Sequence, residues 1–197
     1  MARSTPGIFC LEGPWSSVLT DASSVQPLLE TVGRLNQAKY LYERVHTRDE
    51  LLYLARKWGQ KRYGTYGVGY FAFHGSPGTV HLGREKVTLD ELGEELRGKL
   101  QGRVVHFGSC EVFQTDVDEL QAFRRKTGAR AISGYREAVD WMQSAAFDLL
   151  YFDAFAYKSN IDAIVRDVME QAQGLAKLLQ FTVVSGSRSN PVSPIYD

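Results

Sequence analysis

The chain has 197 residues, of which 44% are hydrophobic and 23% charged, an ordinary composition for a globular domain with a sizeable core. Its 23 basic and 23 acidic side chains cancel, which gives no indication of nucleic-acid or membrane-surface binding. The first residues do not form an apolar signal core, and the apolar stretches are too short to span a bilayer. We therefore expect one cytoplasmic domain over residues 1–186, followed by a polar tail over residues 187–197.

The first third of the chain alternates short apolar runs with helical patterns. Residues 7–11 form an apolar run between prolines and glycines, which predicts a buried strand. Apolar residues recur at helical spacing over residues 25–37, with Ser23 and Ser24 as candidate N-caps. Residues 40–45 are rich in aromatic and branched residues, as strands are.

The next elements lead to a histidine. Thr47 and Glu50 have the spacing of a capping pair, and they predict a helix over residues 48–62. A continuous apolar run at residues 68–73 is typical of a strand covered on both faces, and it stops at His74. We expect His74 to enter a glycine-rich loop.

The remaining elements continue the alternation and bring in a cysteine. Residues 79–86, which follow Gly75 and Gly78, predict a small hairpin or extended excursion. A short buried strand then ends at Gly108-Ser109-Cys110. In chain order the predictions are an excursion over 79–86, helices over 88–100, 117–126, 139–157 and 161–179, and strands over 104–107, 129–134 and 181–184.

Strands that alternate with helices of 10 to 20 residues predict an α/β fold with three layers, in which a mostly parallel central sheet of about six strands is flanked by helices. Ligands of such sheets bind beyond the carboxyl ends of the strands. His74 and Cys110 both follow such ends, on successive strands. Because neighbouring strands lie roughly 5 Å apart, we expect the two side chains to face one crevice.

A histidine beside a cysteine has a chemical use. A free thiol is a weak nucleophile until a base takes its proton, and His74 is placed to act as that base for Cys110. An attacked carbonyl then needs hydrogen-bond donors for its oxyanion, and the backbone amides of Gly75 and Cys110 are the candidates. The other cysteine and histidines lack this placement and are interpreted as structural: Cys10, His46, His81 and His106.

The residues His74-Gly75 and Gly108-Ser109-Cys110, each after an apolar strand, resemble the caspase-like cysteine peptidases, including metacaspases and bacterial CHAT domains. Residues 129–141 are similar to the stretch that follows the catalytic cysteine in CHAT-like proteins. The likeness spans roughly residues 7–155, and the whole chain resembles a group of stand-alone bacterial caspase-like proteins. The resemblance implies a caspase-like fold with His74 as general base, Cys110 as nucleophile, and Gly75 and Cys110 as the oxyanion hole.

Departures from the family concern the substrate pocket. Caspases have a Gln and metacaspases an Asp two residues before the nucleophile, where this chain has Gly108. The loop after the first strand lacks the arginine with which caspases hold substrate aspartate. Cleavage after Asp is therefore not expected, and Glu12, with Asp140 in the same pocket, is a hypothesis for selection of a basic P1 residue, the residue before the cleaved bond.

The leading prediction is a thiol endopeptidase that acts on a protein or peptide, without metal or cofactor and without binding nucleic acid or membrane. Kinship with regulated bacterial effectors in antiviral defence and cell death suggests an activating partner protein. One alternative is a catalytically silent caspase-like interaction module. Another is a flavodoxin-like nucleotide-binding domain that uses residues 75–78 as a phosphate loop, but Pro77 lacks an amide hydrogen and no Lys-Ser/Thr pair follows.

Overall fold

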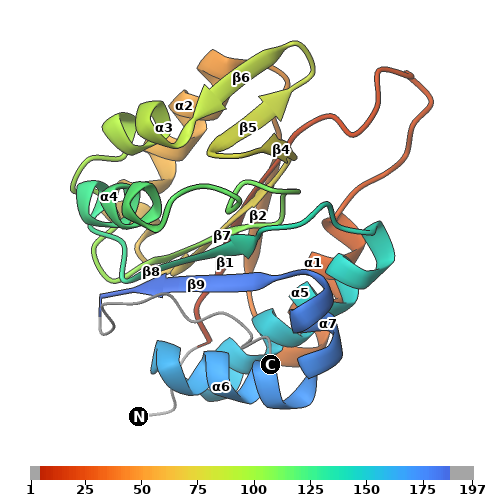
Figure 1. The fold of residues 1–197 in the computed structure, drawn as a ribbon, viewed down its shortest axis with the longest axis vertical. Helices are drawn as coiled ribbons and strands as arrows, with labels where there is room; N and C mark the ends of the chain where they lie inside the picture. The colour runs from red at the N-terminus through yellow and green to blue at the C-terminus, as the bar shows by residue number, and fades with distance from the viewer. Residues whose placement is uncertain (1–4, 187–197) are drawn as a thin grey trace.

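The computed structural model describes residues 5–186. The predictions for the first four residues and for the polar tail over residues 187–197 lie outside this part of the chain. A central six-stranded sheet has the order β2-β1-β3-β7-β8-β9 (Figure 1). Its strands are β1 (Ile8–Glu12), β2 (Tyr40–Arg44), β3 (Val68–Ala72), β7 (Val104–Phe107), β8 (Ala131–Tyr135) and β9 (Phe181–Ser185). All neighbours are parallel except β9, which is antiparallel to β8.

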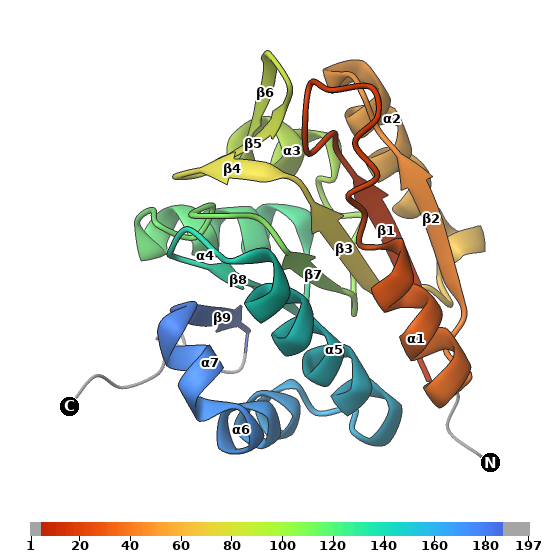
Figure 2. The ribbon, with the colours of Figure 1, turned by 90° about the vertical axis from the view of Figure 1, so that its right-hand side faces the viewer.

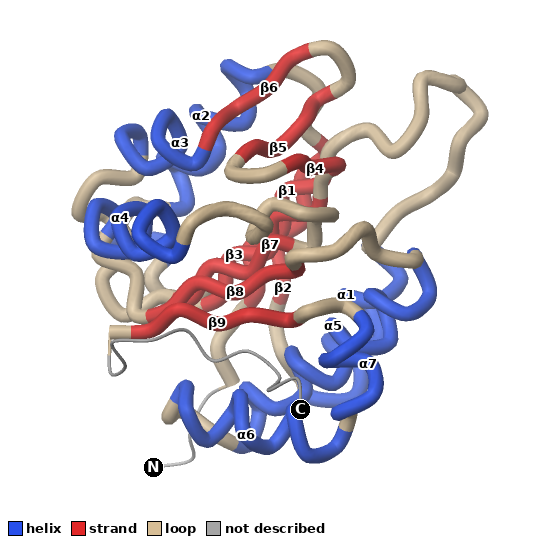
Figure 3. The backbone as a smooth tube through the Cα atoms, viewed as in Figure 1, coloured by secondary structure: helices blue, strands red, loops and turns tan. Residues whose placement is uncertain are grey.

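Helices cover both faces of this sheet (Figures 1 and 2). One face carries α1 (Gln26–Asn36), α5 (Trp141–Tyr157), α6 (Ile161–Gln171) and α7 (Gln173–Leu178). The other carries α2 (Arg48–Trp58), a 3₁₀ turn (Lys61–Tyr63), α3 (Leu89–Glu95) and α4 (Val117–Thr127). The tube in Figure 3 shows the three layers, with strands between two groups of helices. The predicted three-layer α/β architecture is confirmed.

Each central strand is buried on both sides. In β1, Ile8 and Cys10 belong to the core under α1 and α5, whereas Phe9 and Leu11 belong to the core under α2. This alternation follows from the two-residue period of a strand, and it explains why the strands read as continuous apolar runs. No helix of the described residues 5–186 is long and apolar enough to cross a membrane.

A second, three-stranded antiparallel sheet lies beside the carboxyl end of β3. It consists of β4 (His74–Ser76), β5 (Thr79–Leu82) and β6 (Glu85–Thr88). The hairpin predicted over residues 79–86 is confirmed as β5 and β6. The prediction that His74 enters a loop is wrong, because residues 74–76 pair with β5 and only Pro77 and Gly78 form the turn.

Several helix boundaries differ from the predictions. The helix expected over residues 161–179 breaks at Ala172, whose dihedral angles of −128° and 38° are not helical, and the break lets α6 and α7 both pack against α5. The helix expected to reach residue 100 ends at Glu95, before Gly98 with a φ of 67°. The helix expected over residues 48–62 ends at Trp58.

The start of α1 also differs. Neither Ser23 nor Ser24 occupies the N-cap, which is Val25 and has no side-chain cap. The Val25 N–H instead donates to a carboxylate oxygen of Glu12, and Ser24 Oγ accepts from the N–H of Gln26. Ser24 thus still accepts the amide two residues further on, as a capping serine does, while a distant carboxylate satisfies the amide of Val25.

Candidate functional site

The exits of β3 and β7 bring His74 and Cys110 to the same edge of the sheet. The two strands are parallel neighbours, with Phe71 opposite Phe107. Hydrogen bonds continue past the ladder: the N–H of Gly108 donates to the Phe71 carbonyl at 3.0 Å, and that of Phe73 donates to Ser109 Oγ at 3.2 Å. The backbone that carries the cysteine is therefore tied to the backbone that carries the histidine.

His74 is exposed and is oriented by Trp15, which follows β1. Its Nε2 lies 2.8 Å from the Trp15 carbonyl oxygen, and the two rings meet edge to face with centroids 5.2 Å apart. A carbonyl oxygen can only accept, so Nε2 carries the hydrogen of this bond. In the neutral ring Nδ1 is then the nitrogen with a free lone pair.

Cys110 is half-buried beside the segment that leads into α5. Its Sγ lies 3.5 Å from the backbone nitrogen of Val139, which donates to it. Within the described residues, His74 and Cys110 are not hydrogen-bonded to each other. They share one pocket of about 100 Å³, on whose wall both lie.

Gly75 allows the segment that carries His74 and the segment that carries Cys110 to lie in close contact. A Cβ at this position would lie 2.5 Å from the Cys110 carbonyl oxygen and 2.5 Å from a methyl group of Val112, so no larger residue fits. Because Ser76 and Thr79 flank a two-residue turn, alternation of the antiparallel ladder leaves Gly75 in a pair that exchanges no backbone hydrogen bonds with β5. Its N–H is thus not used by β5.

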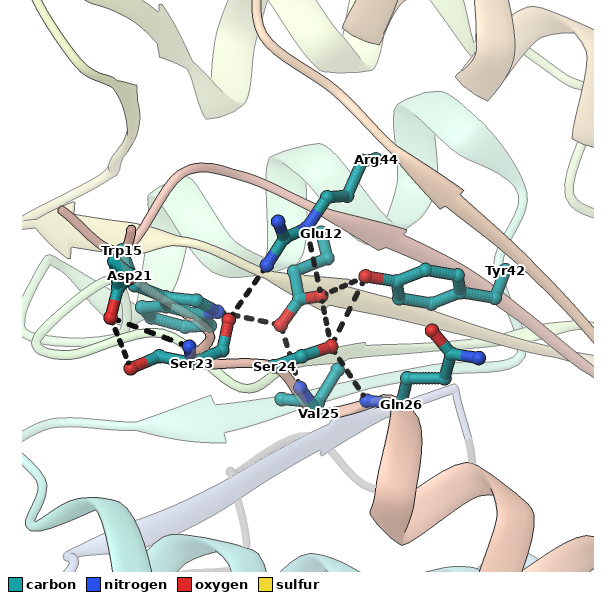
Figure 4. A network of polar contacts seen from close by, with 9 residues as sticks. All are labelled: Glu12, Trp15, Asp21, Ser23, Ser24, Val25, Gln26, Tyr42 and Arg44. Carbon is teal, nitrogen blue, oxygen red and sulfur yellow. Dashed lines mark hydrogen bonds and ion pairs between the residues drawn. The ribbon is translucent and has the colours of Figure 1, made fainter. Parts of the chain in front are cut away.

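Glu12 has a structural position and does not line the pocket. Its side chain is completely buried at the end of β1, where it is surrounded by donors (Figure 4). The donors are Trp15 Nε1 at 2.6 Å, the Val25 N–H at 2.6 Å, Ser24 Oγ at 2.7 Å and the Tyr42 hydroxyl. Arg44 lies 3.8 Å away as an ion-pair partner. Glu12 thereby holds both ends of the loop between β1 and α1, and the structure gives no basis for its predicted contact with substrate.

Of the other two predicted pocket residues, Gly108 lines the pocket and Asp140 does not. Gly108 does line the pocket, and it packs so closely on Tyr70 that a Cβ would lie 2.4 Å from that ring. Asp140 is the N-cap of α5, and its Oδ1 accepts the N–H groups of Met142 and Gln143, each at 3.0 Å. It lies between two pocket residues in the sequence without lining the pocket itself.

Sequence reasoning missed a buried polar network below the pocket. The carboxylate of Asp148, on α5, accepts the Tyr70 hydroxyl at 2.6 Å and the Tyr135 hydroxyl, and lies 2.7 Å from His106 Nε2. His106 Nδ1 lies 3.0 Å from Ser133 Oγ. The available signals were a lone histidine in an apolar strand and an aspartate, Asp148, within an apolar helix. Burial, together with the charge of Asp148, raises the pKa of Tyr70 and of Tyr135 well above the ordinary value, so both remain donors.

Neither a group of metal-binding side chains nor a loop suited to bind phosphate is formed by residues 5–186. Among residues 5–186, no three His, Cys, Asp or Glu side chains are grouped to hold a metal ion. The glycine segment proposed as a phosphate loop belongs to β4 and its turn, and a Cβ on Gly78 would lie 2.7 Å from the Glu119 carboxylate. A carboxylate beside that turn disfavours an anion there.

Comparison with known proteins places the chain in a family without assigning an activity. No curated protein matches it. The match to a family covers residues 6–184, which include every strand of the central sheet except the last residue of β9. Over this span, the chain belongs to the family described as a family of unknown function, DUF6642.

Proposed function

We propose that this chain is a caspase-like cysteine endopeptidase with Cys110 as nucleophile and His74 as base. The observation that carries the proposal is that the two side chains open onto one pocket at the carboxyl ends of neighbouring parallel strands. Sites of open α/β sheets lie at this edge. Cys10 is the contrasting thiol, since it is completely buried in β1.

The orientation of His74 supports this assignment of roles. Its Nε2–H is held by the Trp15 carbonyl, which leaves Nδ1 to take the thiol proton of Cys110. The thiolate then forms a bond to the substrate carbonyl carbon, and the imidazolium returns the proton to the departing amine as the amide bond breaks. Water, activated by the same imidazole, releases the acid and regenerates the thiol.

The backbone around the dyad offers donors for the oxyanion. The N–H of Gly75 is not used by β5, and that of Cys110 lies two residues after Gly108, whose own N–H donates to the Phe71 carbonyl. Both belong to segments that Gly75 packs together. In this proposal they bind the negative oxygen of the tetrahedral intermediate, as preorganised backbone amides do in acyl transfer.

Each member of the dyad is hydrogen-bonded to the backbone of another segment, Trp15 for His74 and Val139 for Cys110. Catalytic hydrogen bonds are often incomplete without substrate. The resemblance of the sequence to regulated caspase-like effectors supports an activating partner protein as part of the proposal. A catalytically silent interaction module is the second candidate, favoured by the missing direct bond between His74 and Cys110.

Labelling with iodoacetamide separates these candidates. We expect wild-type protein to be alkylated at Cys110, with a rate that falls at least about tenfold in His74→Ala, because the thiol then loses its base. Cys10→Ala serves as the matched cysteine control and should label like wild type. Labelling that follows Cys10, or that ignores the loss of His74, would contradict the protease proposal and favour the silent module.

A further inference from the structure

The pocket beside the dyad is lined mainly by apolar side chains. Besides the dyad and Tyr70, its polar side chain is Ser144, whose hydroxyl donates to the Trp141 carbonyl at 3.1 Å. Its walls are formed by Trp15, Val25, Tyr70, Val139, Trp141 and Ala145. Among the described residues that line it, the titratable side chains are those of His74, Cys110 and Tyr70, and the Tyr70 hydroxyl is bonded to Asp148. The pocket thus offers a side chain no opposite charge.

Two buried carboxylates lie behind the walls and are already satisfied. Glu12 holds Trp15 and Val25 from behind, by their indole N–H and backbone N–H. Asp148 holds Tyr70 in the same way. These two carboxylates therefore fix the shape of the pocket without contributing charge to it, and a Lys or Arg side chain placed there would lose its hydration without gaining an ion pair.

The size of the pocket restricts its occupant to one side chain. Its volume of about 100 Å³ is well below the roughly 300–1,000 Å³ of pockets that hold drug-sized ligands. That space suits a branched aliphatic side chain, and Trp141, which meets Trp15 edge to face at 4.7 Å between centroids, closes one side.

We propose that this pocket is the P1 subsite and that the chain cleaves after a medium-sized aliphatic residue such as Leu or Val. The inference rests on the proposed peptidase function. The P1 side chain is attached next to the carbonyl that the thiolate attacks, so a cavity with Cys110 and His74 on its wall is adjacent to that side chain. This replaces the basic P1 residue expected from Glu12, because Glu12 is enclosed.

The test uses peptide acyloxymethyl ketones that are identical except at P1, which carries Leu, Val, Ala, Lys or Asp. We expect the Leu or Val probe to modify Cys110 at least about tenfold faster than the Lys and Asp probes, the scale on which hydrophobic pockets discriminate. Iodoacetamide, which has no P1 side chain, reports the state of the dyad separately. If Lys or Asp probes react faster while alkylation depends on His74, the inference is overturned and the peptidase proposal stands.

A variant tests the pocket directly. Ala145→Leu on α5 reduces the cavity, and we expect the ratio of the Leu-probe rate to the Ala-probe rate to fall at least about tenfold. The matched control is Ala146→Leu, at the next, exposed position of the same helix, which should leave the ratio as in wild type. An unchanged ratio in folded Ala145→Leu would overturn the assignment of the subsite. If Ala145→Leu does not fold, the comparison of the five probes on wild-type protein still tests the P1 assignment. If no labelling of Cys110 depends on His74, both the P1 assignment and the peptidase proposal are overturned.

Discussion

At the scale of single residues, two buried carboxylates do most to determine the environment of the site. Asp148 is 1% exposed and binds the hydroxyls of two tyrosines and the ring of His106. Glu12 is fully buried and binds donors from three separate segments. A buried charge is tolerated only when its hydrogen bonds are complete, so removal of either carboxylate leaves several donors unpaired.

Replacement of Asp148 by Ala should lower the free energy of unfolding by about 3–5 kcal/mol, as expected when one partner of a buried ionic network is removed. Urea denaturation followed by circular dichroism measures this change. Asp153→Ala, on the same helix, is the control, because Asp153 accepts one hydrogen bond, from Asn36, and should cost only about 0.5–1.5 kcal/mol. Equal losses in the two variants would contradict the role of the network.

Replacement of Glu12 by Gln should destabilise the loop between β1 and α1 by about 1–3 kcal/mol, because an amide NH₂ group then faces donors. Limited proteolysis of residues 13–25 should become faster than in Glu30→Gln, whose carboxylate accepts a bond from Gln26 within α1. Any change in P1 preference should not be selective for Lys probes, since Glu12 supports the pocket walls Trp15 and Val25 and contributes no charge to the pocket. A selective loss of reactivity with Lys probes would instead restore the hypothesis of a charged subsite.

At the scale of the elements, the exits of β3 and β7 act as one unit. Gly108 donates to Phe71, Phe73 donates to Ser109, and Gly75 contacts the Cys110 backbone. The position of the dyad is thus determined by packing between two strand exits. The short strand β4 adds rigidity to the histidine, since residues 74–76 are paired with β5.

Gly75→Ala is expected to separate these exits. The added methyl group meets the Cys110 carbonyl oxygen at 2.5 Å, so the backbone must move, and overpacking of this kind costs about 1–3 kcal/mol. We expect a lower melting temperature and slower His74-dependent alkylation of Cys110. Gly174→Ala in α7, where no atom lies within 4 Å of the new Cβ, should instead stabilise the protein slightly, by about 0.5–1 kcal/mol. If Gly75→Ala and Gly174→Ala had similar melting temperatures and similar rates of Cys110 alkylation, packing between the exits of β3 and β7 would not determine the position of the dyad.

At the scale of the whole molecule, the alternation of strands and helices was predictable because it depends on local periodicity. Long apolar runs, such as β3 and β7, identified the strands and placed His74 and Cys110 at their ends. The walls of the pocket were not predictable, because their partners are distant in the chain: Tyr70 and Asp148 are 78 residues apart, and His74 and Trp15 are 59 apart. Helix ends were missed where tertiary packing, as at Ala172, overrides local propensity.

The two cores share one sheet, and we therefore expect the chain to unfold in a single cooperative transition. Trp58 reports on the core beneath α2, whereas Trp15 and Trp141 report on the pocket side. The double variant Trp15→Phe/Trp141→Phe keeps only Trp58, whereas Trp58→Phe keeps the two tryptophans of the pocket. Within each variant, the fluorescence and the circular dichroism signal should change at the same urea concentration. Separate midpoints for fluorescence and circular dichroism within one variant would show that the two faces unfold as independent units.

Because the Cys10 thiol is buried, its reaction with a reagent depends on unfolding of the protein. It lies in the middle of β1, is 0% exposed, and its pKa is raised well above the ordinary thiol value by burial and by Glu12 and Asp148. A disulfide reagent added to the native protein should therefore titrate one equivalent of thiol at once, from Cys110. The second equivalent should appear no faster than the sheet opens, and at reagent concentrations where reaction outpaces reclosing its rate equals the unfolding rate under conditions where no spectroscopic change is visible.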